Sequence, residues 1–168
     1  MTVRVKWREM LLFGMLWAML GTTAVEGSQE IMKNLTMAFG KTLEICKKEL
    51  SLSDQVMQDF YSFWKEDHPL TNSELGCALM CIANKLHMVS EDYTVHHQNT
   101  HEFAKQNGAD DEMAKQLVSL LHNCETTTTG YKDDCTRVLE IAKCFKAKIH
   151  ELKWAPTMEL VEEALIEV

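Results

Sequence analysis

Hydrophobic residues recur with the period of an α-helix along most of this chain. The clearest stripe is spaced by 3, 4, 3, 4 and 3 residues and consists of Cys135, Val138, Ala142, Phe145, Ile149 and Leu152. Few residues interrupt the pattern, since the chain holds only 2 Pro and 7 Gly. The pattern predicts an all-α protein, a single compact bundle of about six helices with a further helix in the C-terminal tail.

Local signals predict where the helices begin and end. Ser53-Asp54 and Asp110-Asp111 are typical helix caps, and residues 71–74 resemble a capping box. The predicted boundaries are a break at Gly40, a helix from Val56 to Trp64, a short helix closed by Gly108, a loop over residues 125–134 and an amphipathic tail over residues 157–168.

The first 27 residues differ from the rest of the chain. Arg4, Lys6 and Arg8 precede an unbroken apolar run of 12 residues from Met10 to Gly21. This run is shorter than the roughly 20 residues that a membrane-spanning helix needs. It predicts a secretory signal peptide over residues 1–27 and a secreted, extracellular domain over residues 28–168. The alternative is a buried N-terminal helix.

Charge and motifs narrow the function. With 17 Lys+Arg against 25 Asp+Glu, the net charge of −8 argues against a nucleic-acid partner. The sequence contains no G-x-S-x-G, no H-E-x-x-H and no glycine-rich phosphate loop. We therefore expect neither an enzyme nor a cofactor.

Six cysteines lie within residues 28–168. Six cysteines can form three disulfides in 15 different ways. Cys77 and Cys81 are four residues apart, so they share one helix face and can tie it to two neighbouring helices. Cys135 and Cys144 are nine residues apart in one helical segment, so they point to opposite faces of the helix and need different partners. Disulfides between helices suit this arrangement better than a zinc site does, and we expect no bound metal.

The cysteine spacing, with the segments SQEIMKNL, FYSFWKED, GADDEMAKQLV and CFKAKIHELKWAP, resembles the insect odorant-binding protein family, and within it the moth pheromone-binding proteins. The resemblance covers essentially all of residues 28–168. It implies the pairs Cys46–Cys81, Cys77–Cys135 and Cys124–Cys144. It also implies an apolar internal cavity for long-chain alcohols, acetates or aldehydes.

The same resemblance implies which residues line that cavity. Phe39 and Phe145 match the aromatic pair that sandwiches the ligand chain. The other matching residues are Phe63, Trp64, Leu79 and Phe103, with Met32, Leu35, Met88, Val118 and Leu121 as further candidates. The alternative is that these side chains form an ordinary hydrophobic core.

The residues that would hold the ligand's head group depart from the family pattern. Ala83 and Met80 stand where some relatives place a serine and an asparagine that bind the head group. This predicts a less polar head, an acetate or aldehyde, or anchoring by Thr36, Asn84 or Glu125.

Histidines and the acidic tail suggest release of the ligand by acid. The resemblance places His96, His97 and His122 beside a loop over the cavity, and histidine titrates in the mildly acidic range. It also implies that the tail enters the cavity in acid. The tail carboxylates that must then be neutralised include Glu159, Glu162 and Glu163, which predicts release at a lower pH than in relatives with more apolar tails. The alternative is a set of solvated histidines and a frayed terminus.

These expectations combine into one functional hypothesis. The protein is expected to carry a pheromone through sensillum lymph toward an olfactory receptor or membrane surface, as a monomer or weak homodimer. The alternatives are a general odorant or lipid carrier of the same fold, and a secreted helical signalling protein. Asn34-Leu35-Thr36 is also a glycosylation sequon.

Overall fold

The computed structural model describes residues 6–166 of the chain, and the side chains of residues 25–166. This part of the chain forms seven helices and one isolated β-bridge, between Val89 and Val95. The helices are α1 (Lys6–Leu50), α2 (Asp54–Tyr61), α3 (Ser73–Lys85), α4 (His97–Gln106), α5 (Asp111–Thr127), α6 (Asp134–Glu151) and α7 (Met158–Ile166). The predicted all-α bundle with a tail helix is confirmed.

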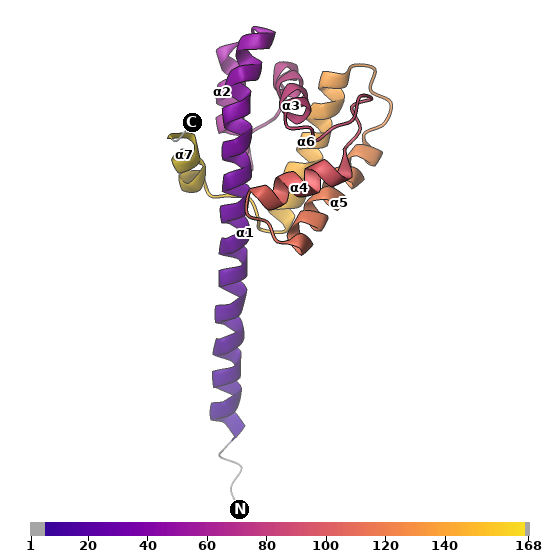
Figure 1. Cartoon of the computed structure of the whole chain (residues 1–168). Coiled ribbons are helices and arrows are strands. Elements are labelled where there is room, and N and C mark those ends of the chain that lie inside the picture. Colours follow the sequence, from indigo (N-terminus) through magenta and orange to yellow (C-terminus); the bar gives the residue numbers. More distant parts are fainter. Residues whose placement is uncertain (1–5, 167–168) are drawn as a thin grey trace, which may run out of the picture.

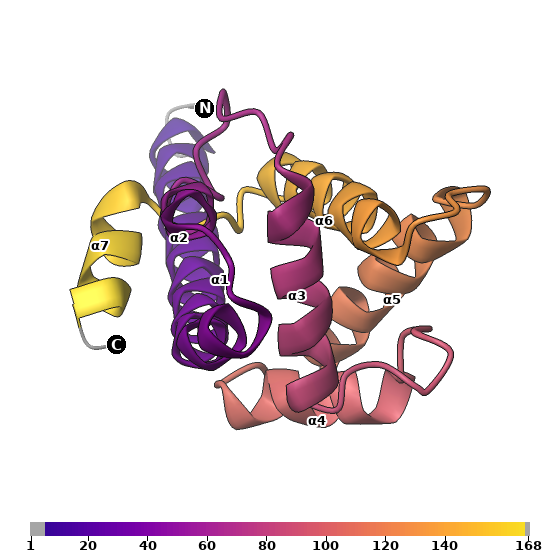
Figure 2. The same ribbon diagram turned by 90° about the horizontal axis from the view of Figure 1, so that it is seen from above.

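The helices gather around the second half of α1, while its first half extends beyond them (Figure 1). Seen along α1, helices α3, α4, α5 and α6 lie on one side of it and α7 lies on the other (Figure 2). At the contact between α3 and α6 the backbones approach closely, because a Cβ atom on Gly76 would lie 2.0 Å from the carbonyl oxygen of Cys135. Only glycine fits at this position.

Three disulfides join these helices, with no free cysteine among the described residues. Cys46–Cys81 ties α1 to α3, Cys77–Cys135 ties α3 to α6, and Cys124–Cys144 ties α5 to α6. The pairing implied by the resemblance is confirmed. So are the two geometric expectations: Cys77 and Cys81 join α3 to two neighbours, and Cys135 and Cys144 go to different partners.

Side-chain caps explain several helix starts. The side chains of Asn72, Asp110 and Asp133 accept hydrogen bonds from the first turns of α3, α5 and α6. Gly108 follows the end of α4 with a φ of 102°, the left-handed conformation that glycine adopts at low cost. Ser53, by contrast, precedes α2 without capping it, and its hydroxyl donates to Glu74 on α3 instead.

Three predicted boundaries are wrong. Helix α1 runs through Gly40 without a break, since the burial of Leu43 and Thr36 on either side offsets the roughly 1 kcal/mol helix penalty of a glycine. Helix α2 ends at Tyr61, so Phe63 and Trp64 lie in the turns after it. Helix α5 continues to Thr127 because threonine hydroxyls at its end donate to the carbonyl oxygens of Asn123 and Cys124.

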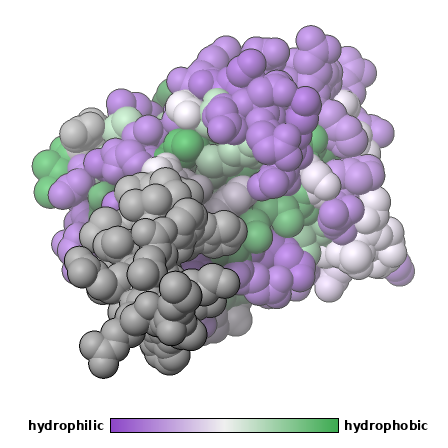
Figure 3. Space-filling model, turned by 90° about the horizontal axis from the view of Figure 1, so that it is seen from below, coloured by the Kyte–Doolittle hydropathy of each residue, from purple (hydrophilic) through white to green (hydrophobic). Residues whose placement is uncertain are grey.

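The predicted end of the signal peptide lies inside α1, which runs from Lys6 to Leu50. Within the part of the chain that the structure describes, no helix is both long enough and apolar enough to cross a bilayer. The face shown in Figure 3 is mostly hydrophilic, and hydrophobic residues gather near its centre and at its left edge.

Candidate functional site

A cavity of about 180 Å³ lies between helices α1 to α6 and the residues that connect them. Its wall is almost entirely apolar. It consists of Met32, Leu35, Thr36, Phe39, Phe60, Phe63, Trp64, Leu79, Met80, Ala83, Met88, Val89, Tyr93, Val95, Thr100, Phe103, Ala104, Leu117, Leu121, Glu125, Val138, Ile141, Ala142 and Phe145. One water molecule needs at least about 10–15 Å³ of such space, so the cavity has room for roughly a dozen atoms of that size.

The cavity wall contains every residue predicted to line it except Val118. Val118 is buried on α5 but does not reach the cavity, whereas its neighbour Leu117 does. Periodicity alone could not choose between two adjacent apolar residues on one helix. Of the three proposed head-group anchors, Thr36 and Glu125 line the cavity, while Asn84 is exposed on α3 and does not.

Sequence reasoning missed several lining residues, and two groups of them are instructive. Val138, Ala142 and Leu117 share helix stripes with predicted residues, so the 3.6-residue period could have identified them. Val89, Tyr93 and Val95 belong to the irregular segment between α3 and α4, where no period exists. The bridge between Val89 and Val95 holds that segment in place over the cavity.

Aromatic rings form much of the wall. Phe39 from α1 meets Phe103 from α4 edge to face, with ring centroids 5.8 Å apart. Phe63 and Trp64 meet in the same way at 4.9 Å. Such pairs are favoured beyond the area that they bury, so they help to keep the wall rigid.

Polar side chains on the wall are few, and those of Thr36, Trp64 and Thr100 are hydrogen-bonded to the protein. The indole nitrogen of Trp64 donates to the hydroxyl of Thr36 at 2.9 Å, and this hydroxyl donates to the carbonyl oxygen of Met32 at 2.7 Å. The hydroxyl of Thr100 donates to the carbonyl oxygen of Met88 at 3.1 Å.

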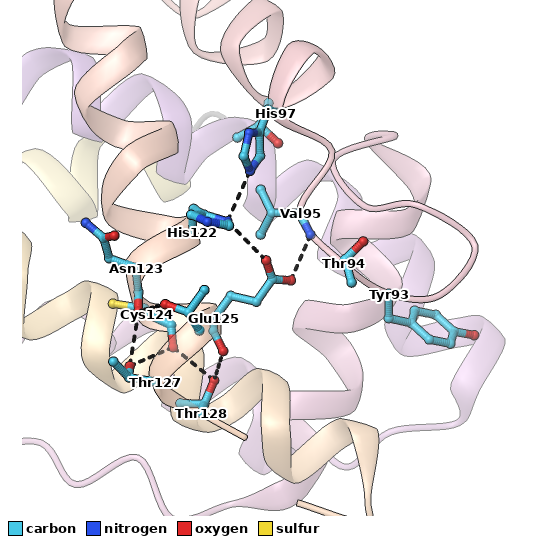
Figure 4. A network of polar contacts seen from close by, with 12 residues as sticks. Tyr93, Thr94, Val95, His97, His122, Asn123, Cys124, Glu125, Thr127 and Thr128 are labelled. Atoms are coloured by element: carbon cyan, nitrogen blue, oxygen red, sulfur yellow. Dashed lines mark hydrogen bonds and ion pairs between the residues drawn. The ribbon is translucent and has the colours of Figure 1, made fainter. Parts of the chain in front are cut away.

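Glu125 joins helix α5 to the segment over the cavity (Figure 4). Its Oε1 accepts a hydrogen bond from the backbone nitrogen of Val95 at 2.8 Å, and its Oε2 lies 3.7 Å from Nδ1 of His122. That nitrogen of His122 is also 3.2 Å from Nε2 of His97. The predicted histidines His97 and His122 are therefore in contact with each other, at the edge of the cavity wall.

The third predicted histidine, His96, serves as the N-cap of α4. Its Nδ1 accepts a hydrogen bond from the backbone nitrogen of Asn99 at 3.3 Å. A protonated imidazole cannot accept a hydrogen bond, so this cap exists only for neutral His96.

Other charged groups hold the same segment. Arg137 on α6 donates to the carbonyl oxygen of Tyr93 at 3.1 Å. The hydroxyl and backbone nitrogen of Thr94 donate to Asp92, and these bonds lower the pKa of the Asp92 carboxyl. Helix, loop and histidines thus form one connected polar network beside an apolar cavity.

The tail helix lies outside the cavity. Val161 and Ala164 are buried against the rest of the protein, and Glu163 forms an ion pair with Lys33 on α1 over 3.2 Å. Hydrogen bonds from Lys33 to Glu163 and Glu30 raise its pKa. None of the described residues of α7 lines the cavity, and Glu159, Glu162 and Glu163 are exposed to solvent. Residues 167–168 of the predicted amphipathic tail lie outside the described residues.

Comparison with known proteins identifies the family. The sequence profile of the PBP/GOBP family matches residues 28–148. The chain belongs to the PBP/GOBP family. It is 49% identical to pheromone-binding protein 2 of Epiphyas postvittana over 162 residues, which cover 96% of this chain and 98% of that protein. It is 38% identical to general odorant-binding protein 2 of Heliothis virescens over 144 residues, 86% of this chain and 89% of the other.

A solved PBP/GOBP-type structure has the same fold. The crystal structure of Epiphyas postvittana pheromone binding protein 3 matches with a TM-score of 0.64 at 49% identity, covering 68% of this chain and 98% of that one. Since these relatives are binding proteins, family membership makes this chain a carrier of hydrophobic ligands and not an enzyme.

Proposed function

We propose that this protein carries one long-chain hydrophobic pheromone in its cavity and, once secreted, moves it through the aqueous lymph of a sensillum. The observation that supports this most is the cavity itself, an apolar space large enough for a chain of roughly a dozen atoms. Burying a dozen methylene groups would provide about 10 kcal/mol before the costs of association. The pheromone-binding relative is also more similar to this chain than the general odorant-binding relative, at 49% against 38% identity.

We further propose that mild acid opens the segment between α3 and α4. Protonation of His96 removes its hydrogen bond to Asn99 and places a positive charge at the N-terminus of α4, where the helix dipole disfavours it. Protonation of both His97 and His122 places two positive charges at a 3.2 Å contact. Glu125 on α5 and Arg137 on α6 also face this segment, so its charges and hydrogen bonds rearrange together.

The second part of the release proposal concerns the tail. To enter the cavity, α7 would have to give up the ion pair between Glu163 and Lys33 and the buried positions of Val161 and Ala164. Acid weakens the ion pair by neutralising the carboxylate, and also removes charges from the tail before it enters an apolar space. Because the tail carries several carboxylates, we expect it to enter at a lower pH than a more apolar tail would.

The test is displacement of a fluorescent apolar probe by long-chain alcohols, acetates and aldehydes at neutral and acid pH. We expect displacement at neutral pH and loss of ligand in acid. Removal of residues 157–168 should preserve binding in acid if the tail expels the ligand. Equal loss of ligand at the same pH with and without the tail would refute its role.

A general odorant carrier is the second candidate, supported by the match to general odorant-binding protein 2. The same panel separates the two. A pheromone carrier should prefer a narrow range of chain lengths, whereas a general carrier should bind short and cyclic odorants equally well. Delivery to a receptor or membrane surface belongs to the same proposal and needs an assay with receptor-bearing membranes.

A further inference from the structure

The polar side chains of the cavity wall share a property that bears on ligand chemistry. They are Thr36, Trp64, Tyr93, Thr100 and Glu125. The Trp64 N–H points to the Thr36 hydroxyl, the Thr36 hydrogen to the carbonyl oxygen of Met32, and the Thr100 hydrogen to the carbonyl oxygen of Met88. Each of these three donors therefore already has a partner inside the protein.

The oxygen atoms of these side chains, in contrast, can still accept hydrogen bonds. A hydroxyl oxygen has two lone pairs, and among the described residues only Trp64 donates to that of Thr36. The Thr100 hydroxyl receives no hydrogen bond from the described part of the chain, and Glu125 receives one, from the backbone of Val95. Thr36 and Thr100 are 6% and 2% exposed as whole residues, so bulk water does not easily satisfy these lone pairs.

We propose that the cavity selects a ligand whose head group donates a hydrogen bond, a long-chain alcohol, and that Thr36 determines this preference. The proposal rests on the proposed function, since it names the head group of the ligand bound in that cavity. An alcohol donates to a free lone pair and leaves every existing bond intact. An acetate or aldehyde offers only acceptors, so away from the Tyr93 phenol it must either face oxygen lone pairs or break one of the three internal bonds.

An alcohol head group differs from the acetate or aldehyde head group that Ala83 and Met80 predict in the sequence. Those residues show that two positions cannot anchor a head group, but they say nothing about the hydrogen bonds that the remaining polar groups already make. The remaining side-chain donor on the wall is the phenol of Tyr93, whose ring points away from the Glu125 and His122 network (Figure 4). A preference for carbonyl head groups would therefore have to depend on Tyr93.

The experiment compares an alcohol with its methyl ether and its acetate at one chain length, in probe displacement at neutral pH. The ether keeps the oxygen but has no hydrogen to donate. We expect the alcohol to bind roughly three- to tenfold more tightly than the ether, the effect of one hydrogen bond. Thr36→Val should remove this preference and favour the acetate, because it deletes the acceptor and frees the Trp64 N–H.

Thr42→Val is the matched control. Thr42 is buried on the same helix and also donates to the carbonyl four residues earlier, that of Ala38, but it does not line the cavity. It should keep the preference for alcohol. Trp64→Phe provides a second variant should Thr36→Val fold poorly: it frees another lone pair on Thr36, so the alcohol preference should persist or grow.

Tighter binding of the ether or acetate by the unmodified protein would overturn the proposal. So would loss of the alcohol preference in Trp64→Phe, or an unchanged preference in folded Thr36→Val. A further outcome would also overturn it. If the unmodified protein binds alcohol and acetate equally well and Tyr93→Phe loses acetate binding, then Tyr93 and not Thr36 contacts the head group. If no long-chain compound, including the alkane, displaces the probe, the carrier function itself fails.

Discussion

The buried ammonium group of Lys146 on α6 donates a hydrogen bond to the carbonyl oxygen of His68 over 3.1 Å. It also donates to the carbonyl oxygen of Lys65. Both carbonyls belong to the turns that follow α2, next to the cavity residues Phe63 and Trp64. One side chain on α6 therefore holds in place the irregular segment that forms part of the cavity wall.

Replacing Lys146 by methionine should destabilise the protein by about 1–3 kcal/mol, because two carbonyl oxygens lose their donor while the apolar stem is kept. Ligand affinity should also fall as Trp64 loses its support. Chemical denaturation and probe binding measure the two effects. Lys148→Met, at an exposed position on the same helix, is the control and should change neither.

Burial lowers the pKa of Lys146, against the opposing effect of Asp67 and Glu66. Its folded-state pKa therefore lies below its unfolded value, and between these two values the unfolded chain binds more protons. Stability should consequently rise with pH in this interval below about 10.5, relative to Lys146→Met. The measurement is the free energy of unfolding of the unmodified protein minus that of Lys146→Met. If this difference falls as pH rises through the interval, the pKa of Lys146 is not lowered by folding.

Gly76→Ala should be strongly destabilising. The added methyl group would lie 2.0 Å from the carbonyl oxygen of Cys135, so α3 and α6 would have to separate next to the Cys77–Cys135 disulfide. Overpacking of this severity costs about 3 kcal/mol or more. Thermal unfolding should show the loss, whereas Asn84→Ala, exposed on the same helix, should leave the melting temperature nearly unchanged.

Undocking the tail should leave neutral-pH binding intact. Val161→Asn buries an amide where α7 packs against the rest of the protein, so the tail should detach and become sensitive to proteases. Because the described residues of α7 lie off the cavity wall, affinity at neutral pH should stay within about twofold of the unmodified protein. A large loss of affinity would mean that the docked tail supports the cavity. Glu162→Gln, exposed on the same helix, is the control.

His96→Asn tests the cap of α4. Asparagine is a good N-cap residue at any pH, so the variant should hold the start of α4 in acid and retain ligand to a lower pH. His87→Asn changes an exposed histidine that contributes only its backbone carbonyl oxygen to this region, as an acceptor from Asn99, and should release ligand as the unmodified protein does. Identical release curves for all three proteins would exclude His96 as a sensor.

Much of the architecture could be predicted because helices and disulfides leave regular signals. The stripe from Cys135 to Leu152 defines α6, and the cap at Asp110 defines the start of α5. The predicted break at Gly40 is wrong because helix propensity is a weak influence that tertiary packing overrides. The predicted loop begins too early, because threonine hydroxyls after Cys124 bond to carbonyl oxygens in the last turn of α5.

The cavity was harder to predict than the helices. Phe39 and Phe145 could be placed on its wall only through the family resemblance, since a core and a cavity wall have the same hydrophobic pattern. Tyr93 and Val95 lie in a segment without periodicity. Nor could the sequence show that the Trp64 N–H donates to the Thr36 hydroxyl, 28 residues away, and so is occupied inside the protein.

The central claim is that a long hydrophobic chain binds inside this cavity. A crystal structure of residues 28–168 with a long-chain alcohol at neutral pH tests it most directly. We predict electron density for one chain among Phe39, Phe103 and Phe145, with the helices in their present positions. A ligand bound on the outer surface, with the cavity collapsed or empty, would contradict the claim.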